Sequence, residues 1–180
     1  MKTASFAFLE VQFRMELPVR RWLGHETPWF VENSDFFITI CCHPRGTNQL
    51  CRPDLGRWIL EAVAHRHKNF TWFVWGCVLM PDHLHAVIST GTRISLKDSV
   101  REFKKWVALK TGVHWQKGFF DHRIRNDAYV NTFCRYMERN PVRAGLVENW
   151  RLWPYYYEGK NRTSRRLVPT KLGISSLKLR

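Results

Sequence analysis

Acidic residues are scarce in this chain, and long apolar runs are absent. The 180 residues include 15 Asp and Glu against 29 Lys and Arg, which gives a net charge of +14. An excess of this size predicts a polyanionic partner, with nucleic acid favoured over an anionic membrane surface. The longest apolar run, WFVWGCVLM at residues 72–80, is far shorter than the stretch of about 20 residues that spans a bilayer. We therefore expect no membrane-spanning segment.

Cysteine is also infrequent. The five cysteines are odd in number and form no C-x-x-C pair. This pattern is typical of reduced cysteines in a cytoplasmic protein. Glu10 and Arg14 interrupt the apolar residues near the N-terminus, so we expect no secretory signal.

The length suits one folded domain with short flanking segments. Residues 1–35 show no clear period and are interpreted as a lead-in segment. Residues 36–158 hold the patterned elements and form the predicted domain. The tail, residues 159–180, contains seven basic residues and no acidic one, so we expect it to order only on a phosphate backbone.

Hydrophobic periodicity within the domain predicts alternating strands and helices. Strands are expected at residues 36–42, 71–80, 83–89 and 118–125, with Pro81 and Asp82 as the break in a hairpin. A first helix follows Asp54, its expected N-cap.

Two further helices complete the pattern. The second helix is expected over residues 95–111, with Ser95 and Asp98 at capping-box spacing and Gly112 as the C-terminal cap. The last helix begins after Asn126 or Asp127 and runs to about Asn140.

The resulting order is β-α-β-β-α-β followed by a helix. It predicts an α+β fold of the ferredoxin-like, split βαβ type, with helices on one face of an antiparallel sheet. The strand at 83–89 should be internal, and the last helix is free to cross the sheet.

The stretch VLMPDHLHAVIST, residues 78–90, carries two histidines in an apolar strand. Alternate strand residues share a face, roughly 6.5–7 Å apart, so His83 and His85 can reach one divalent ion. The alternative is two histidines on a partly exposed sheet face without a ligand. Because no cysteine or third histidine lies close by in sequence, an open site completed by an oxygen ligand suits them better than a closed zinc site.

The last helix supplies further candidates on one stripe, namely Tyr129, Phe133, Tyr136 and Asn140. Tyr136 and Asn140 are neighbours one turn apart. The alternative roles are a core tyrosine and a helix-end asparagine.

Basic residues mark a candidate DNA-binding surface. They comprise Lys97, Arg101, Lys104 and Lys105 on the second helix, Arg123 and Arg125 in the last strand, and Arg165 and Arg166 in the tail. Phosphate contact and a merely solvated helix face both remain open. In the same way, the aromatic cluster of residues 153–157 either stacks bases or packs on the sheet.

Three blocks in order, VLMPDHLHAVI, WQKGFFDHRIRN and YMERNPVRAGLV, resemble the REP-associated tyrosine transposases, within the single-tyrosine HUH transposases of bacterial insertion sequences. The resemblance covers about residues 36–153 and makes 36–158 an HUH transposase-like catalytic domain. The family usually has asparagine where this chain has Asp82.

The resemblance implies cleavage and strand transfer on single-stranded or hairpin DNA, with REP-like repeats as possible targets. His83 and His85 would be the ligands of Mg²⁺ or Mn²⁺, and Asn140 would complete the metal shell. Tyr136 would be the nucleophile, on the C-terminal helix, and would form a 5′-phosphotyrosine and a free 3′-hydroxyl.

Two other functions stay open beside this strand transferase. One is a hairpin or single-stranded DNA-binding protein without catalysis, which the joint presence of His83, His85 and Tyr136 disfavours. The other is a metal-dependent nuclease that uses water, with a structural Tyr136. Monomer and homodimer also remain open.

Overall fold

The structure is a computed structural model that describes residues 34–90, 94–126 and 128–159. The predicted lead-in segment and basic tail, including Arg165 and Arg166, lie outside the described residues apart from residues 34, 35 and 159. All five cysteines lie within them and are free. No helix in the described ranges has the length and apolar character needed to cross a bilayer.

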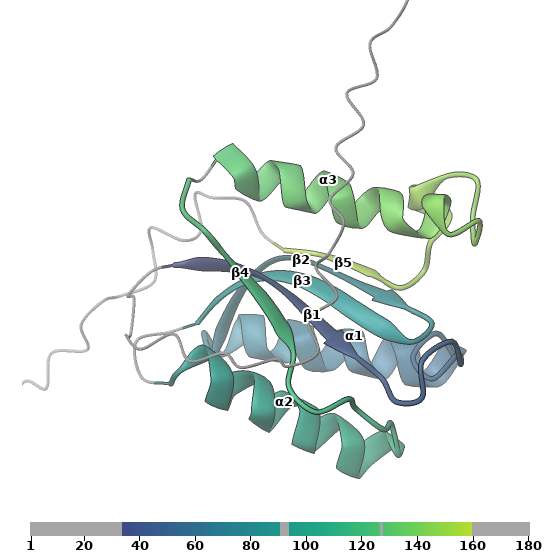
Figure 1. Ribbon diagram of the computed structural model, residues 1–180, viewed down its shortest axis with the longest axis horizontal. Helices are drawn as coiled ribbons and strands as arrows, with labels where there is room; N and C mark the ends of the chain where they lie inside the picture. The colour runs from purple at the N-terminus through teal and green to yellow at the C-terminus, as the bar shows by residue number, and fades with distance from the viewer. Residues whose placement is uncertain (1–33, 91–93, 127, 160–180) are drawn as a thin grey trace, which may run out of the picture.

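Five strands form one antiparallel sheet in the order β4-β1-β3-β2-β5 (Figure 1). The strands are β1 (Asp35–Cys41), β2 (Trp72–Met80), β3 (His83–Thr90), β4 (Phe120–Ile124) and β5 (Tyr156–Glu158). The predicted α+β, ferredoxin-like fold is confirmed, and β3 is the central strand. The histidines therefore lie in the middle of the sheet.

Helices cover both faces of this sheet (Figure 1). On one face lie α1 (Pro53–Lys68) and α2 (Leu96–Thr111), and on the other lies α3 (Ala128–Arg143), followed by the short 3-10 helix η1 (Trp150–Leu152). We call these the α1/α2 face and the α3 face. Alternation along β3 assigns its side chains to them: Leu84, Ala86 and Ile88 join the α1/α2 core, whereas Val87 joins the core under α3.

The β2–β3 hairpin is tied to the loop that follows β1. Met80 pairs with His83, so Pro81 and Asp82 form a two-residue connection, as predicted. The Pro81 carbonyl accepts the amides of residues 49 and 50, and the Asp82 carbonyl accepts the Cys42 amide at 2.8 Å. These bonds hold the loop at residues 43–50 against the start of β3.

The caps of α2 and α3 agree with the sequence. Ser95 accepts the Asp98 amide at 3.0 Å, and Gly112 ends α2 with a left-handed φ of 70°, where glycine is favoured. Asn126 Oδ1 accepts the Ala128 amide at the start of α3.

The start of α1 differs from the prediction that Asp54 is its N-cap. The N-cap is Arg52, which makes no side-chain capping bond, and Pro53 opens the helix. Proline suits this position because its fixed φ is helical and its missing N–H has no helical acceptor. Asp54 instead lies in the first turn, where its charge complements the helix dipole.

The end of α3 was also predicted wrongly, at about Asn140. The helix continues through Pro141 to Arg143. Proline in the last turn removes one helical hydrogen bond, but the next amides still find acceptors: Ala144 donates to the Asn140 carbonyl and Leu146 to the Pro141 carbonyl. Strand β5 was not predicted, because three residues are too few to show a period.

Candidate active site on the α3 face

His83 and His85 lie side by side on the α3 face of β3. Their ring centroids are 4.8 Å apart, with the rings nearly perpendicular. His85 is buried, with 2% of its surface exposed, and His83 is partly buried at the strand end. The pair predicted from spacing is therefore close enough to act on one ligand.

Tyr136 reaches the same place from α3. Its ring centroid is 5.7 Å from that of His85, and Phe37 of β1 packs against both rings at 5.8 and 5.2 Å. Phe133, one turn earlier on α3, stacks on Phe37 at 4.8 Å. These aromatic contacts position α3 so that the tyrosine faces the histidines.

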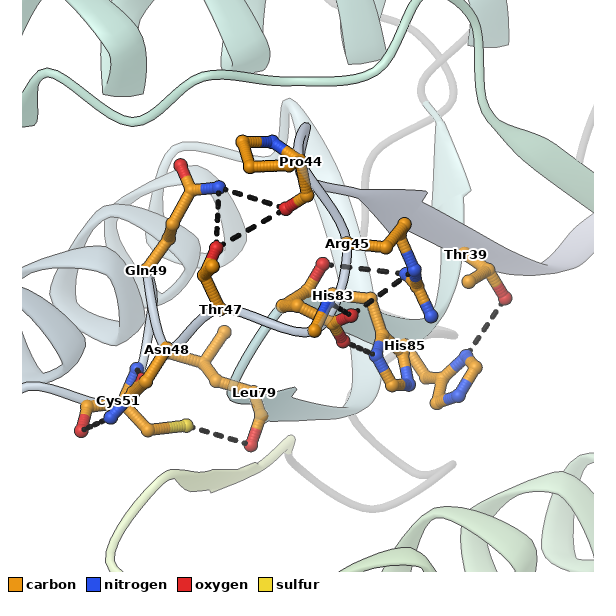
Figure 2. Close-up of polar contacts among 12 residues, drawn as sticks. Thr39, Pro44, Arg45, Thr47, Asn48, Gln49, Cys51, Leu79, His83 and His85 are labelled. Atoms are coloured by element: carbon orange, nitrogen blue, oxygen red, sulfur yellow. Dashed lines mark hydrogen bonds and ion pairs between the residues drawn. The ribbon is translucent and has the colours of Figure 1, made fainter.

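Thr39 fixes the orientation of His85. The two residues are register partners on β1 and β3, and Thr39 Oγ1 is 2.8 Å from His85 Nδ1 (Figure 2). The other ring nitrogen, Nε2, is left to meet a ligand. The hydrogen bond also gives a polar partner to a buried ring.

Asp82 holds His83 in a similar way. Asp82 Oδ1 is 2.7 Å from His83 Nδ1, while its Oδ2 accepts the Gly46 amide at 2.7 Å and Arg45 Nε at 3.1 Å. Arg45 Nη1 also donates to the Asp82 carbonyl at 3.4 Å. Figure 2 shows Arg45 in the loop after β1, beside His83 and His85.

Burial favours the neutral form of both imidazoles. Burial lowers the pKa of His85 well below 6.5, and the nearby His83 and Arg45 add to the effect. Burial also lowers the pKa of His83, although the bond to Asp82 opposes it. For Asp82, burial raises the pKa, but the Gly46 amide, His83 and Arg45 together bring it below 3.8. Neutral imidazoles beside an ionised carboxylate are the forms that a metal site requires.

Asn140 lies one turn beyond Tyr136, as predicted. Its side-chain nitrogen donates to the Tyr136 carbonyl at 3.2 Å, which leaves its Oδ1 as the possible ligand atom. Within the described residues, no group of three or more His, Cys, Asp or Glu side chains could hold a metal ion. A metal at the two histidines would therefore need oxygen ligands from Asn140, water or substrate.

The predicted DNA-binding residues that the structure describes do not gather at this site. Helix α2, which carries four of them, covers the opposite face of the sheet. Lys97, Arg101 and Lys105 are exposed, and Arg101 pairs with Asp98 at 2.9 Å. Lys104 has a structural position instead, because its Nζ donates to the Gln116 and Gly118 carbonyls at 2.7 Å each.

Arg123 lies in the edge strand β4, and Arg125 follows the end of that strand. Arg123 and Arg125 are both exposed, and Arg123 Nε donates to Ser34 Oγ at 3.1 Å. The aromatic cluster at residues 153–157 packs on the sheet. Trp153 donates to the Leu79 carbonyl, and Tyr156 and Tyr157 belong to β5.

Three neighbours of the site were not singled out from the sequence. Thr39 becomes visible only through the β1–β3 register, and Arg45 only through the loop that folds back on Asp82. The third neighbour is Arg143, whose guanidinium carbon lies 5.9 Å from the centre of the Tyr136 ring. Unlike the other two, it could have been found from the sequence. Its spacing of seven residues from Tyr136, two helical turns, could have identified it had the helix been predicted past Pro141.

Comparison with known proteins gives a consistent relationship. No family model matches the chain. A REP-associated tyrosine transposase of Escherichia coli is 23% identical over 131 residues, which are 71% of this chain and 78% of that protein. A Haemophilus influenzae protein with the provisional name of REP-associated tyrosine transposase is 25% identical over 144 residues, 70% of this chain and 80% of its own.

The fold has a counterpart among solved structures. A REP-associated tyrosine transposase bound to a REP hairpin superposes with a TM-score of 0.64 at 21% identity, covering 74% of this chain and 82% of that one. The resemblance carried by the three sequence blocks is thereby confirmed, and the chain is a relative of the REP-associated tyrosine transposases.

Proposed function

We propose that the protein is a DNA strand transferase that cuts and rejoins single-stranded or hairpin DNA through Tyr136. The observation that carries the proposal is the meeting of His83, His85 and Tyr136 on the α3 face, with 5.7 Å between the His85 and Tyr136 ring centres. The two histidines lie on β3 and Tyr136 lies on α3, more than 50 positions later in the sequence, and each side chain is of a type that phosphoryl transfer needs.

The relatives and the charge support DNA as the substrate. Two relatives are named as REP-associated tyrosine transposases, and the solved counterpart is bound to a REP hairpin. The net charge of +14 suits a phosphate backbone. REP-like hairpins are therefore the first substrates to test, and residues 36–158 are the proposed catalytic domain.

The two histidines fit a divalent ion, Mg²⁺ or Mn²⁺, in an open site. Each ring has Nδ1 in a hydrogen bond within the protein, so each can offer Nε2. His83, His85 and Asn140 Oδ1 would hold the ion, with the remaining positions left for water and a DNA phosphate. When bound, the ion supplies charge neutralisation and orientation at the phosphate.

Tyr136 performs the covalent step in this proposal. Its phenol oxygen attacks the phosphorus, the Oη–P bond forms, and the P–O3′ bond breaks. The phenol proton is lost, and the departing 3′-oxygen takes up a proton to become a hydroxyl. The phosphodiester energy is retained in the 5′-phosphotyrosine, so a 3′-hydroxyl can reverse the step and join strands without a nucleotide cofactor.

Arg143 is suitably placed to assist the attack. Its guanidinium lies over the Tyr136 ring, and it takes part in none of the ion pairs between described residues. A cation there favours the negative charge of the phosphate that the phenol oxygen approaches.

A covalent-adduct assay tests the proposal. The wild-type protein should form a complex with hairpin DNA that survives denaturation and retains a label at the 3′ end of the cut strand, whereas a label at the 5′ end should leave with the fragment that carries the free 3′-hydroxyl. Tyr136→Phe should lose the adduct and the cleavage but keep the fold, because the tyrosine hydroxyl makes no hydrogen bond with the described residues. Tyr129→Phe is the matched control, since Tyr129 is exposed two turns earlier on α3.

Each outcome has a clear consequence. Cleavage by Tyr136→Phe at the wild-type rate would exclude this tyrosine as nucleophile and favour hydrolysis by water. Hairpin binding without cleavage by the wild-type protein, in the presence of Mg²⁺ or Mn²⁺, would favour a DNA-binding protein.

A further inference from the structure

We propose that Asp82 is a positioning residue, anchored by Arg45 and Gly46, that fixes the tautomer of His83 and so aims His83 Nε2 at the metal. The inference rests on the proposed function, since it concerns the same site. It assigns a role to a carboxylate that directly precedes the first histidine and contacts it at 2.7 Å.

The first step is the chemistry of the Asp82–His83 contact. An ionised carboxylate only accepts hydrogen bonds, so the 2.7 Å contact from Asp82 Oδ1 requires a proton on His83 Nδ1. In a neutral imidazole this proton leaves a lone pair on Nε2. An asparagine at this position could accept through its oxygen or donate through its nitrogen, and would permit either tautomer. The carboxylate removes that choice.

The second step is the anchoring of the carboxylate. The Gly46 amide and Arg45 Nε both bind Oδ2, which leaves Oδ1 for His83. The side chains of Asp82 and His83 are only 14% and 18% exposed, so water competes weakly for the bond between them, whereas the Arg45 side chain is half exposed. Gly46 has φ of 78°, a left-handed conformation that favours glycine, and a Cβ there would meet no atom within 4 Å. The backbone conformation of Gly46, rather than lack of space, is therefore the local requirement.

The third step is the contrast with His85. Its Nδ1 meets the Thr39 hydroxyl, which can either donate or accept. Thr39 orients the ring but leaves its tautomer free. The two imidazoles are thus held differently, and only His83 has a charged partner that dictates the position of its proton.

The consequence concerns metal affinity. A carboxylate behind a ligating histidine fixes the ring and makes it a better donor, and loss of such a partner typically costs 10–100-fold in metal affinity. We expect Asp82→Ala to weaken Mn²⁺ binding by about 10–100-fold. Asp82→Asn keeps an oxygen at the same place but loses the charge, so its affinity should lie between those of Asp82→Ala and the wild type.

The test combines two measurements on the full chain. Nitrogen-15 NMR of the metal-free protein reports which nitrogen of His83 carries the proton, and calorimetry with Mn²⁺ reports affinity. The wild type should show Nδ1–H at His83, Asp82→Asn should show a mixture, and Asp54→Asn should match the wild type in both measurements. Asp54 is the matched control because it is exposed on α1 and the charge change is identical.

The outcomes separate this inference from the proposed function. An Nε2–H tautomer at His83 in the wild type would overturn the role of Asp82 and leave the strand transferase intact. The role of Asp82 would also be overturned if Asp82→Asn kept the wild-type tautomer and Mn²⁺ affinity. This variant should fold even if Asp82→Ala does not. If the wild type shows Nδ1–H but binds no Mn²⁺, both the metal site and this inference are wrong.

Discussion

The two faces of the sheet differ in what they bury. The α1/α2 face encloses the larger apolar core, which includes fully buried Trp72, Ile59 and Phe103. Among the described residues, the α3 face has a smaller apolar cluster around Phe37, Val87 and Met137. This cluster lies on the same side of the sheet as the histidines. The larger core therefore lies on one side of the sheet and the candidate active site on the other.

The contrast shows where the fold accepts polar groups. Burial of an imidazole is unfavourable unless its polar atoms find partners. On the α3 face each histidine has such a partner, supplied by Thr39 and Asp82. The large core on the α1/α2 face makes this tolerable, because it stabilises the sheet independently of the site.

The largest expected effect comes from removal of a histidine on the α3 face. His83→Ala and His85→Ala should each lower the cleavage rate by about 10³-fold or more, since a metal contributes several kcal/mol to such a reaction. DNA affinity should change little, because the basic residues are spread over the chain. Calorimetry with Mn²⁺ should show the site abolished in either variant. Full cleavage in EDTA would contradict the metal site altogether.

Paired phenylalanine truncations test whether the two faces divide stability and activity. Phe103→Ala on the α1/α2 face should lower the free energy of unfolding by about 3–5 kcal/mol. Phe133→Ala should cost less stability, because Phe133 belongs to the smaller core and retains slight exposure. It should nevertheless cost more activity at a temperature where both variants are folded, since Phe133 packs α3 against Phe37. Urea unfolding measures the loss of stability, and cleavage rates measure the loss of activity. If Phe133→Ala lost more stability and Phe103→Ala lost more activity, the two faces would not divide stability and activity in this way.

The pH dependence of stability should come from the α3 face. Burial lowers the pKa of His83 and His85 in the folded protein, so below about pH 6.5 the unfolded chain binds more protons than the folded one. The stabilisation is complete above pH 6.5 and is lost as pH falls from there through the folded pKa values, by up to about 1.4 kcal/mol per pH unit for each imidazole. His85→Gln should flatten this slope in urea unfolding between pH 7.5 and 5. A slope in His85→Gln equal to that of the wild type would contradict this role of the buried imidazole.

The sequence predicted the elements well where the periodicity was strong. The buried stripe of Leu96, Val100, Phe103 and Val107 in α2 and the alternation in β3 are long enough to define their element type. The failures fall at ends and short elements. Pro141 was taken as a stop although the last helical turn tolerates it, and β5 is too short to show alternation.

The site was predictable only in part. His83 and His85 share a strand, so their proximity follows from spacing alone. Their proximity to Tyr136 depends on how α3 crosses the sheet, and periodicity does not define that crossing. The resemblance to a known family supplied that link. Lys104 is the opposite case: its charge suggested a DNA contact, whereas its ammonium binds two backbone carbonyls.

The basic residues of α2 allow a test of whether DNA also contacts the face opposite the site. The triple variant Lys97→Ala, Arg101→Ala, Lys105→Ala should weaken DNA binding and flatten its log–log salt dependence by about 0.7 for each phosphate that the variant no longer neutralises. The cleavage rate at saturating DNA should not change, because the reacting groups lie on the α3 face. Lys104→Met is the control, since it should lower stability without changing the salt slope. An unchanged salt dependence in the triple variant would show that these α2 residues do not contact DNA phosphates.

The smallest expected effect concerns the hydrogen bond between Thr39 and His85. Thr39→Val replaces the hydroxyl by a methyl group of similar size, so the packing of the buried position is kept and only the bond to His85 Nδ1 is removed. Loss of a partner for a buried polar atom costs about 1–3 kcal/mol of stability. Mn²⁺ affinity should fall by about 10-fold, the lower end expected for a partner of a ligating histidine, because a neutral hydroxyl polarises the ring less than a carboxylate does. Thr39→Ser is the matched control, since it keeps the hydroxyl and should retain most of the affinity. If Thr39→Val weakens Mn²⁺ binding as much as Asp82→Ala does, or more, the charged partner has no advantage over the neutral one, and the expected ranking of the two partners is wrong.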